Sequence, residues 1–167
     1  KDYDALNEYL NNYQKSIPDE HIFFCENSAV NAILSYFSEQ ARTFGITYTV
    51  STSIPKQISI SETDLSILFG NLLENAIDAC NAQSGEDKKI IVRAKTDNHS
   101  LCVTIDNTFS GSLDIDQEGH FVSSKHEGLG LGTESIKSIA EKYGGVCQFE
   151  ANNGMFYASV MCFKDHA

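Results

Sequence analysis

The stretch Asn71-Leu72-Leu73-Glu74-Asn75-Ala76-Ile77-Asp78-Ala79 lies inside the longest helical pattern of the chain. Asn71, Asn75 and Asp78 follow one another at helical spacing, so they share one face of that helix. Amide and carboxylate oxygens suit Mg²⁺, which keeps several of its waters and bridges phosphate groups. The stretch therefore predicts a magnesium and phosphate site or, as the plainer alternative, a helix face exposed to solvent.

The apolar residues around this stretch recur with helical spacing and predict a helix from about 61 to about 82. Ser61 followed by Asp64 resembles the capping box that begins a helix, with Asp at the usual Glu position. The remaining patterns predict further helices at 2–16, 27–44 and 131–143, and strands at 46–50, 89–96, 101–107, 146–151 and 155–163. This order of elements indicates one domain with a mixed sheet that is covered by helices on one face.

A second motif, Gly128-Leu129-Gly130-Leu131-Gly132-Thr133, opens the helix predicted near the C-terminal end. Glycines let the backbone approach a ligand closely, and the first N–H groups of a helix point at anions. The spacing is not that of the dinucleotide fingerprint, and the Gly-Lys-Ser/Thr of a P-loop does not occur in the chain. The motif predicts a phosphate site, with a flexible hinge as the alternative.

Residues 108–127, between the predicted strand and these glycines, show neither helical nor strand periodicity. Loops of this length are uncommon in compact domains and often act as lids. Lys125 would bring one cation close to a bound ligand. We expect a mobile lid in this segment, with a disordered insertion as the alternative.

The chain has 167 residues and a formal net charge of −11, from 12 Lys+Arg and 23 Asp+Glu. This length fits one domain with a real core. The acidity argues against a nucleic-acid partner, which needs a basic surface, and against direct contact with an anionic membrane surface. Five scattered cysteines without a Cys-x-x-Cys pair argue against a zinc site and favour a reducing, cytoplasmic compartment.

Taken in order, these motifs resemble the GHKL domain, the ATP-binding catalytic domain shared by histidine kinases, gyrases and related ATPases. Residues 72–76 resemble its N box and residues 128–132 its second glycine box. Tyr143-Gly144-Gly145 matches the His-Gly-Gly that usually closes the following helix, so the resemblance spans about 27–163. It implies the Bergerat ATP-binding fold, which is α+β: a two-layer α/β sandwich whose mixed, mostly antiparallel sheet carries helices on one face.

Within this superfamily the sequence resembles the histidine kinases more than the hydrolysing ATPases. Gyrase-like members carry a water-activating Glu four residues before the metal-binding Asn, and Asn71, a poor base, occupies that place here. Residues 71–79 followed by Ile105-Asp106-Asn107 look like the accessory-gene-regulator type of sensor kinase. This implies the cytoplasmic domain of a membrane-bound receptor, with a response regulator, often of the LytTR type, as a partner.

The resemblance implies ATP and Mg²⁺ as cofactors and assigns roles to the matching positions of this sequence. Asn75 matches the Mg²⁺-binding Asn, and Asn71 matches the first Asn of the N box. Lys125 lies where the family often has a Lys at the end of its lid, and the glycines that face the phosphates are Gly128, Gly130 and Gly132. Asp78 departs from the pattern, because the commoner kinases carry Lys or Arg at that position.

Two neighbouring residues are candidates for contacting adenine, because the family's first glycine box, Asp-x-Gly-x-Gly, is altered here. Leu101, Val103 and Ile105 alternate along the predicted strand, and this phase puts Asn107 on their face. The amide oxygen of Asn107 can accept a hydrogen bond from the adenine amino group, although more weakly than a carboxylate. Asp106 is the alternative if the register differs by one residue.

The chain offers no residue that fits the family's phosphoacceptor His, since His21 precedes the strand-like Ile22-Phe23-Phe24. The resemblance implies that this His lies upstream on a dimerisation domain, of which residues 1–17 would be the tail and 18–167 the catalytic domain. Two other hypotheses stay open. The chain could be a nucleotide-degenerate interaction module of the same fold, or a serine kinase of the anti-sigma-factor type.

The acidic residues are concentrated in the two segments that are expected to bind the anionic nucleotide. Segment 61–83 holds four acids and no base, and segment 106–127 holds five acids against Lys125 alone. The dipole of the glycine helix offers only about half a positive charge. We therefore predict that Mg²⁺ is close to obligatory for ATP binding.

Overall fold

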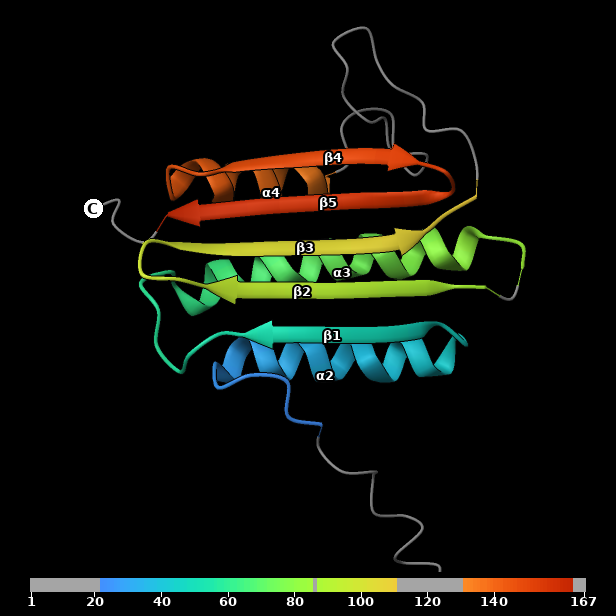
Figure 1. Cartoon of the computed structure of the whole chain (residues 1–167), viewed down its shortest axis with the longest axis horizontal. Coiled ribbons are helices and arrows are strands. Elements are labelled where there is room, and N and C mark those ends of the chain that lie inside the picture. Colours follow the sequence, from blue (N-terminus) through green and yellow to red (C-terminus); the bar gives the residue numbers. More distant parts are fainter. Residues whose placement is uncertain (1–21, 86, 111–130, 164–167) are drawn as a thin grey trace, which may run out of the picture.

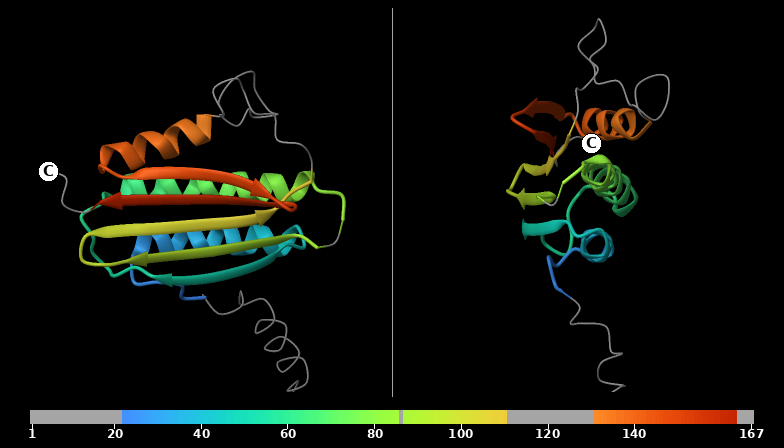
Figure 2. Two further views of the ribbon diagram at one scale, coloured as in Figure 1. Left: turned by 45° about the horizontal axis from the view of Figure 1, so that its top comes forward. Right: turned by 90° about the vertical axis from the view of Figure 1, so that its right-hand side faces the viewer.

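The computed structural model describes residues 22–85, 87–110 and 131–163, which form one sheet with helices on one of its faces (Figure 1). The helices are α2 (Ser28–Thr43), α3 (Glu62–Ala82) and α4 (Leu131–Lys142). The strands are β1 (Thr47–Ser53), β2 (Lys89–Thr96), β3 (Ser100–Thr108), β4 (Val146–Asn152) and β5 (Met155–Phe163). Seen from the side, the helices form a second layer and leave the other face of the sheet open (Figure 2).

The strands follow the order β1-β2-β3-β5-β4 across the sheet. β1 and β2 are parallel, because α3 connects them as a crossover on the covered face. The pairs β2–β3, β3–β5 and β4–β5 are antiparallel, with short turns at 97–99 and 153–154. The two-layer sandwich with a mixed, mostly antiparallel sheet is therefore confirmed.

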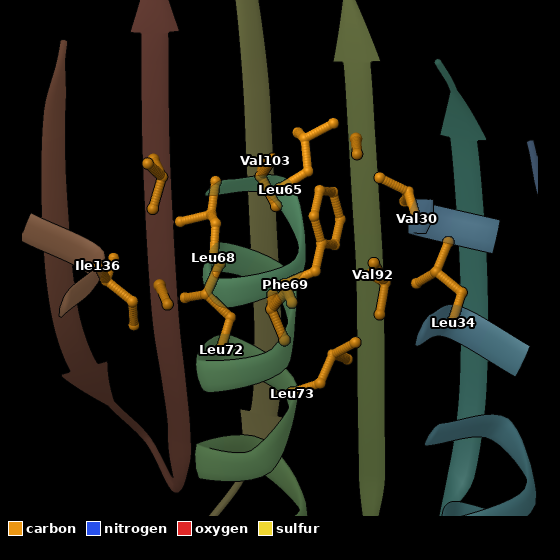
Figure 3. Close-up of a cluster of buried hydrophobic side chains, with 14 of the residues drawn as sticks. Val30, Leu34, Leu65, Leu68, Phe69, Leu72, Leu73, Val92, Val103 and Ile136 are labelled. Atoms are coloured by element: carbon orange, nitrogen blue, oxygen red, sulfur yellow. The ribbon is translucent and has the colours of Figure 1, made fainter. Parts of the chain in front are cut away.

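The core lies between the sheet and α3, which buries apolar side chains along most of its length. Figure 3 shows Leu68 and Leu72 on the side of Ile136 in α4, and Phe69 on the side of Val92 in β2. All five side chains are at most 3% exposed. Full burial of each such side chain stabilises the fold by roughly 1.5–3 kcal/mol, so α3 is the element around which the other two helices are placed.

The ends of α2 follow from its local sequence. Asn27 caps the helix, because its side-chain oxygen accepts a hydrogen bond of 3.1 Å from the backbone N–H three residues later. Gly45 has a φ of +66°, which glycine adopts without strain, and the helix stops just before it, as predicted. The strand expected at 22–24 is wrong: this segment lies beside β1 and accepts a bond of 2.6 Å from Thr52 Oγ1, but it joins no ladder.

A polar cluster joins the beginning of α3 to the end of α4; we call Ser61, Asp64, Lys142 and Tyr143 the helix-end cluster. Asp64 and Tyr143 are buried, whereas Ser61 and Lys142 are exposed. Ser61 caps α3 as predicted and accepts a bond of 3.1 Å from Asp64 N. The carboxylate of Asp64 does not return to the Ser61 backbone; it accepts bonds from Ser61 Oγ (2.6 Å), Tyr143 Oη (2.6 Å) and Lys142 Nζ (2.7 Å). The Ser61 N–H donates to Tyr143 Oη instead, at 3.0 Å.

The same cluster controls the ionisation of Asp64. The hydrogen bond from Lys142, followed by those from Ser61 and Tyr143, lowers the pKa of Asp64 to about 2. The carboxylate is therefore charged at neutral pH, and the beginning of α3 is held to the end of α4 by an ionic contact as well as by hydrogen bonds from uncharged donors.

The glycine pair after Tyr143 lets the chain turn back tightly onto the sheet. A Cβ at Gly145 would lie only 1.8 Å from Met161 O in β5, so no side chain fits there. Gly145 N donates to Ala140 O at 2.8 Å, which closes the last turn of α4. The Tyr-Gly-Gly segment is thus the structural end of α4.

Candidate functional site

Asn71 and Asn75 lie on the side of α3 that faces the beginning of α4. A Cβ added to Gly132 would lie 3.0 Å from Asn71 Oδ1 and 3.5 to 3.6 Å from the amide atoms of Asn75. Two motifs that are far apart in the sequence are therefore in contact. Glycine at position 132 permits this approach, because a methyl group there would press on the Asn71 oxygen.

Asn71 is half-buried, and the backbone of its own helix orients its amide. Its Nδ2 donates to Ile67 O, one turn earlier, at 2.8 Å. The oxygen Oδ1 is consequently the atom that lies toward Gly132. Asn75, one turn later on the same face, is exposed. Because Asn71 packs against α4, the alternative of a solvent-exposed helix face does not hold for this residue. Asn75 is exposed and is therefore accessible to a ligand.

Two acids lie near Asn75 on α3. Glu74 is exposed and Asp78 is half-buried. Both add negative potential next to the asparagines, so an anionic ligand is repelled unless it arrives with a cation. The arrangement favours a metal-bound phosphate over a free one.

Asp106 and Asn107 lie near the end of β3 and point to opposite faces of the sheet. Asn107 is 2% exposed and pairs with Ile90 of β2, so it lies on the covered face with the apolar residues of its own strand. Asp106 lies on the open face, where its carboxylate accepts a bond of 2.7 Å from Arg93. The strand phase is the one that the sequence predicts, and it leaves Asp106 on the face away from the helices.

The sequence patterns did not single out Thr108 and Cys80, which hold the end of β3 against α3. Thr108 O accepts a hydrogen bond from Asn107 Nδ2 at 3.0 Å, and Cys80 Sγ lies 3.4 Å from the same oxygen. Thr108 Oγ1 accepts a bond from Lys89 N at 3.0 Å. Burial raises the pKa of the Cys80 thiol, which therefore stays protonated at neutral pH. No periodicity reveals these contacts, because they join residues from three different elements.

Three predicted site residues, Lys125, Gly128 and Gly130, lie outside the described part of the chain. The helix expected at 2–16 lies outside it as well. Their roles stay predictions. Among the three glycines of the motif, Gly132 lies in the described part of the chain, in the first turn of α4. The end of β3, which carries Asn107, and the beginning of α4, which carries Gly132, lie toward the same end of the sheet (Figure 2).

The donors of this region fit a partly hydrated magnesium ion. Within residues 22–85, 87–110 and 131–163, no three His, Cys, Asp or Glu are placed to hold a metal ion together. Mg²⁺ does not need such a group, because it keeps several waters and takes one or two protein oxygens together with phosphate oxygens. The exposed amide of Asn75 can supply one such oxygen, and Asn71 Oδ1 lies close by, on the side of Gly132.

Comparison with known proteins agrees with this geometry. The family model for the GHKL domain matches residues 60–162, which is more than half of the chain. The matched region begins just before α3 and ends in β5, so it contains the asparagine stretch, Asn107 and the glycine motif. Among the described residues, no helix has the length and apolar composition that crossing a membrane requires.

Similar proteins include a probable C4-dicarboxylate sensor kinase of Bacillus subtilis (strain 168), which is 24% identical over 136 residues. The match covers 77% of this chain and 25% of that protein, so the chain spans about a quarter of its relative's length. The nucleotide-free catalytic domain of histidine kinase ThkA has a TM-score of 0.62 at 23% identity, covering 83% of this chain and 92% of that one. ThkA in complex with the response regulator TrrA gives 0.58 at 20% identity, covering 83% of this chain and 40% of that one. The two structural matches show a shared fold.

Proposed function

This chain belongs to the GHKL domain family, and we propose that it is the ATP-binding catalytic domain of a two-component sensor histidine kinase. The relative and the solved structures described above are sensor or histidine kinases by name, which supports this enzyme class. The observation that carries the proposal is the contact of Gly132 with Asn71 and Asn75. It joins an amide face suited to a metal ion and a helix N-terminus suited to phosphates.

In this proposal each described residue has a limited task. Asn75 supplies an oxygen to Mg²⁺, and Asn71 lies next to it. The first N–H groups of α4, beginning near Gly132, bind phosphate oxygens, and Asn107 contacts the base. Magnesium, when bound, neutralises charge on the phosphates and aligns them for transfer. Lys125, Gly128 and Gly130 complete the phosphate site.

The reaction needs positioning more than acid or base chemistry. A nitrogen of the acceptor imidazole attacks the γ-phosphorus, the bond from that phosphorus to the β–γ bridging oxygen breaks, and ADP leaves. A water-activating carboxylate is not required, and Asn71 stands at the position where hydrolysing relatives carry one. The chain therefore holds ATP for a protein nucleophile, and we assign no residue of the chain as a catalytic base.

The acceptor and the partners come from outside this chain. We propose that the acceptor His lies on an upstream dimerisation domain, of which residues 1–17 are the tail and 18–167 the catalytic domain. The phosphoryl group then passes to a response regulator, for which the LytTR type is our proposal. The accessory-gene-regulator type of kinase and a location as the cytoplasmic domain of a membrane-bound receptor belong to the same proposal.

Calorimetry of the chain with ATP tests the nucleotide site. We expect binding in Mg²⁺, a loss of at least about 100-fold in affinity when EDTA removes the metal, and a comparable loss in Asn75→Ala. Asn81→Ala, an exposed Asn near the end of the same helix, is the matched control and should bind as the wild type does. A folded wild-type chain that binds no ATP in Mg²⁺ contradicts the proposal and favours the nucleotide-degenerate module.

A further inference from the structure

The open face of the sheet carries a row of side chains that changes from apolar to basic across the strands. Val146 of β4 is the register partner of Met161 in β5, and Met161 is also the partner of Cys102 in β3. Cys102 is in turn the partner of Lys95 in β2, and it lies on the same strand face as Asp106. Side chains directly opposite each other in a sheet are about 5 Å apart, so these residues form one continuous row on the open face.

The apolar end of this row extends along β5. Phe163 follows Met161 by two residues and therefore lies on the same face of the sheet. Val146 is 67% exposed, and Met161 and Phe163 are each 36% exposed. We call these three residues the apolar patch. Exposed apolar side chains that lie together on one face are typical of a surface that binds another molecule.

The other end of the row is basic. Four of the 12 Lys+Arg of the chain lie within residues 88–95. Three of them, Lys89, Arg93 and Lys95, alternate along β2 and are exposed on the open face; we call them the basic stripe. Arg93 pairs with Asp106, whereas no carboxylate of the described residues forms an ion pair with Lys95. On the neighbouring strand β1, the open-face positions are exposed Thr and Ser residues, which add hydrogen-bond donors.

Between the apolar patch and the basic stripe, β3 presents small side chains. Cys102 and Thr104 occupy its open face and are half-buried. β2 and β5 are the two neighbours of β3, so they lie about 10 Å apart. An α-helix with its side chains is about 10–12 Å wide. A helix lying along β3 would therefore contact the apolar patch with one face and the basic stripe with the adjacent face.

The charge of the protein narrows the kind of partner. The whole chain has a formal net charge of −11, so the basic stripe is a local exception on an acidic molecule. A nucleic acid or an anionic membrane extends beyond such a stripe and is repelled by the acidic surface around it. A single acidic helix covers only β3 and its neighbours, and its carboxylates can pair with Lys95 and Arg93.

We propose that the open face of the sheet is a docking surface for an amphipathic helix of a partner protein, with apolar side chains on one face and Asp or Glu beside them. The helix lies along β3, between the apolar patch and the basic stripe. This surface is on the side of the sheet opposite to α3 and α4, which carry the asparagine pair and Gly132 (Figure 2). The proposal is therefore independent of the proposed function.

The test uses the whole chain and two designed helical peptides of about 20 residues each. The first peptide carries Leu at every third or fourth position and Glu at the adjacent positions. The second is identical except that Lys replaces each Glu. Fluorescence anisotropy of labelled peptide measures the affinity. We expect the Glu peptide to bind at least about tenfold more tightly than the Lys peptide.

Substitutions at both ends of the row test where the peptide binds. Lys95→Glu should weaken the Glu peptide at least about tenfold and strengthen the Lys peptide, a reversal that misfolding does not produce. Lys137→Glu, at an exposed cation of α4, makes the same change of charge on the helical layer and should keep the wild-type preference. Val146→Ser should weaken the Glu peptide at least about threefold, and Val146→Leu should bind it as the wild type does.

Several outcomes overturn the proposal. A wild type that binds neither peptide, or both equally, contradicts it, and unchanged binding in Val146→Ser means that charge alone attracts the peptide. A dimer that Val146→Ser dissociates, seen by light scattering, assigns the face to a second copy of the chain. Binding of duplex DNA or of anionic lipid vesicles that Lys95→Glu abolishes assigns it to a polyanion. These measurements contain no nucleotide, so the calorimetric test of ATP binding is decided separately.

Discussion

The two halves of α3 carry polar residues of similar kinds and use them differently. At its beginning, Asp64 is 7% exposed and accepts three side-chain hydrogen bonds of 2.7 Å or less. Further along the helix, Asn75 is exposed and lies next to the bare backbone of Gly132. The hydrogen bonds of Asp64 are all made within the protein and hold two helices together, whereas the amide of Asn75 is accessible to a ligand.

The comparison also corrects the charge argument. Asp64 and Asp106 both belong to the acidic segments that count against an anionic ligand. Asp64 is paired with Lys142 at 2.7 Å, and Asp106 is paired with Arg93 at 2.7 Å on the open face of the sheet. Near the asparagines on α3, Glu74 is exposed and Asp78 is half-buried. The predicted dependence on Mg²⁺ thus rests on fewer acids than the sequence suggests.

The largest effect should come from Gly145→Ala, which places a side chain in the tight turn that follows α4. The new Cβ would overlap Met161 O, and we expect a loss of at least about 4 kcal/mol in the free energy of unfolding, or failure to fold. Urea denaturation measures this. Gly70→Ala is the matched control: nothing lies within 4 Å of its Cβ, so it should change stability by no more than about 1 kcal/mol in either direction.

Tyr143→Phe separates stability from binding. It removes the hydroxyl that donates to Asp64 and accepts from Ser61 N, and we expect a loss of about 2 kcal/mol in unfolding free energy. Affinity for ATP in Mg²⁺ should stay within about twofold of wild type. Tyr36→Phe, at an exposed hydroxyl, should change stability by less than about 0.5 kcal/mol. If a stably folded Tyr143→Phe lost much of its affinity for ATP, the helix-end cluster and the nucleotide site would not be independent of each other, contrary to our expectation.

Acid should weaken the helix-end cluster through Asp64. Its pKa is about 2 in the folded chain, below the value of about 3.9 for an unfolded Asp, so the contribution is complete above pH 4 and is lost as pH falls toward 2. We expect this group to account for up to about 2 kcal/mol of unfolding free energy over that range. Denaturation midpoints measured from pH 5 to pH 2 should fall less steeply for Asp64→Asn than for wild type; equal slopes contradict the assignment.

The smallest effect should come from Gly132→Ala, in the region where α4 begins next to Asn71 and Asn75. A Cβ 3.0 Å from Asn71 Oδ1 must displace the amide by a few tenths of an ångström, and we expect ATP affinity to fall about fivefold, or about 1 kcal/mol. Unfolding free energy should change by less than about 1 kcal/mol, because Ala favours the helix. Unchanged affinity would show that the asparagines tolerate movement and do not depend on this contact.

Hydrophobic periodicity predicted most of the helices and strands because each of them buries one continuous apolar face against the opposite layer. α3 was predicted from about 61 to about 82 and runs over Glu62–Ala82, and the strands at 89–96 and 155–163 have the predicted bounds. The error at 22–24 has a physical cause. A short apolar run can lie beside a sheet edge and make single hydrogen bonds to it without forming a ladder.

The candidate site residues could be recognised in the sequence where one helix carries them and not where several elements meet. Asn71 and Asn75 are visible in the sequence because both lie on one helical face. The contact with Gly132 and the anchoring of Thr108 by Cys80 and Lys89 depend on how helices and strands pack. No local pattern encodes such contacts, so the sequence indicated the residues but not how they are held.

By itself, the sequence determined the family and the chemistry available to this protein: which residues carry amide oxygens, where glycine frees the backbone, and which strand face Asn107 takes. The tertiary structure decided how those groups are used. It assigned Asp64 and Tyr143 to holding the helices together, turned Asp106 to the open face, and fixed the Asn107 amide against Thr108 O. The physical reason is that residue type and spacing set what a side chain can donate or accept, whereas its partners are set by packing between distant segments.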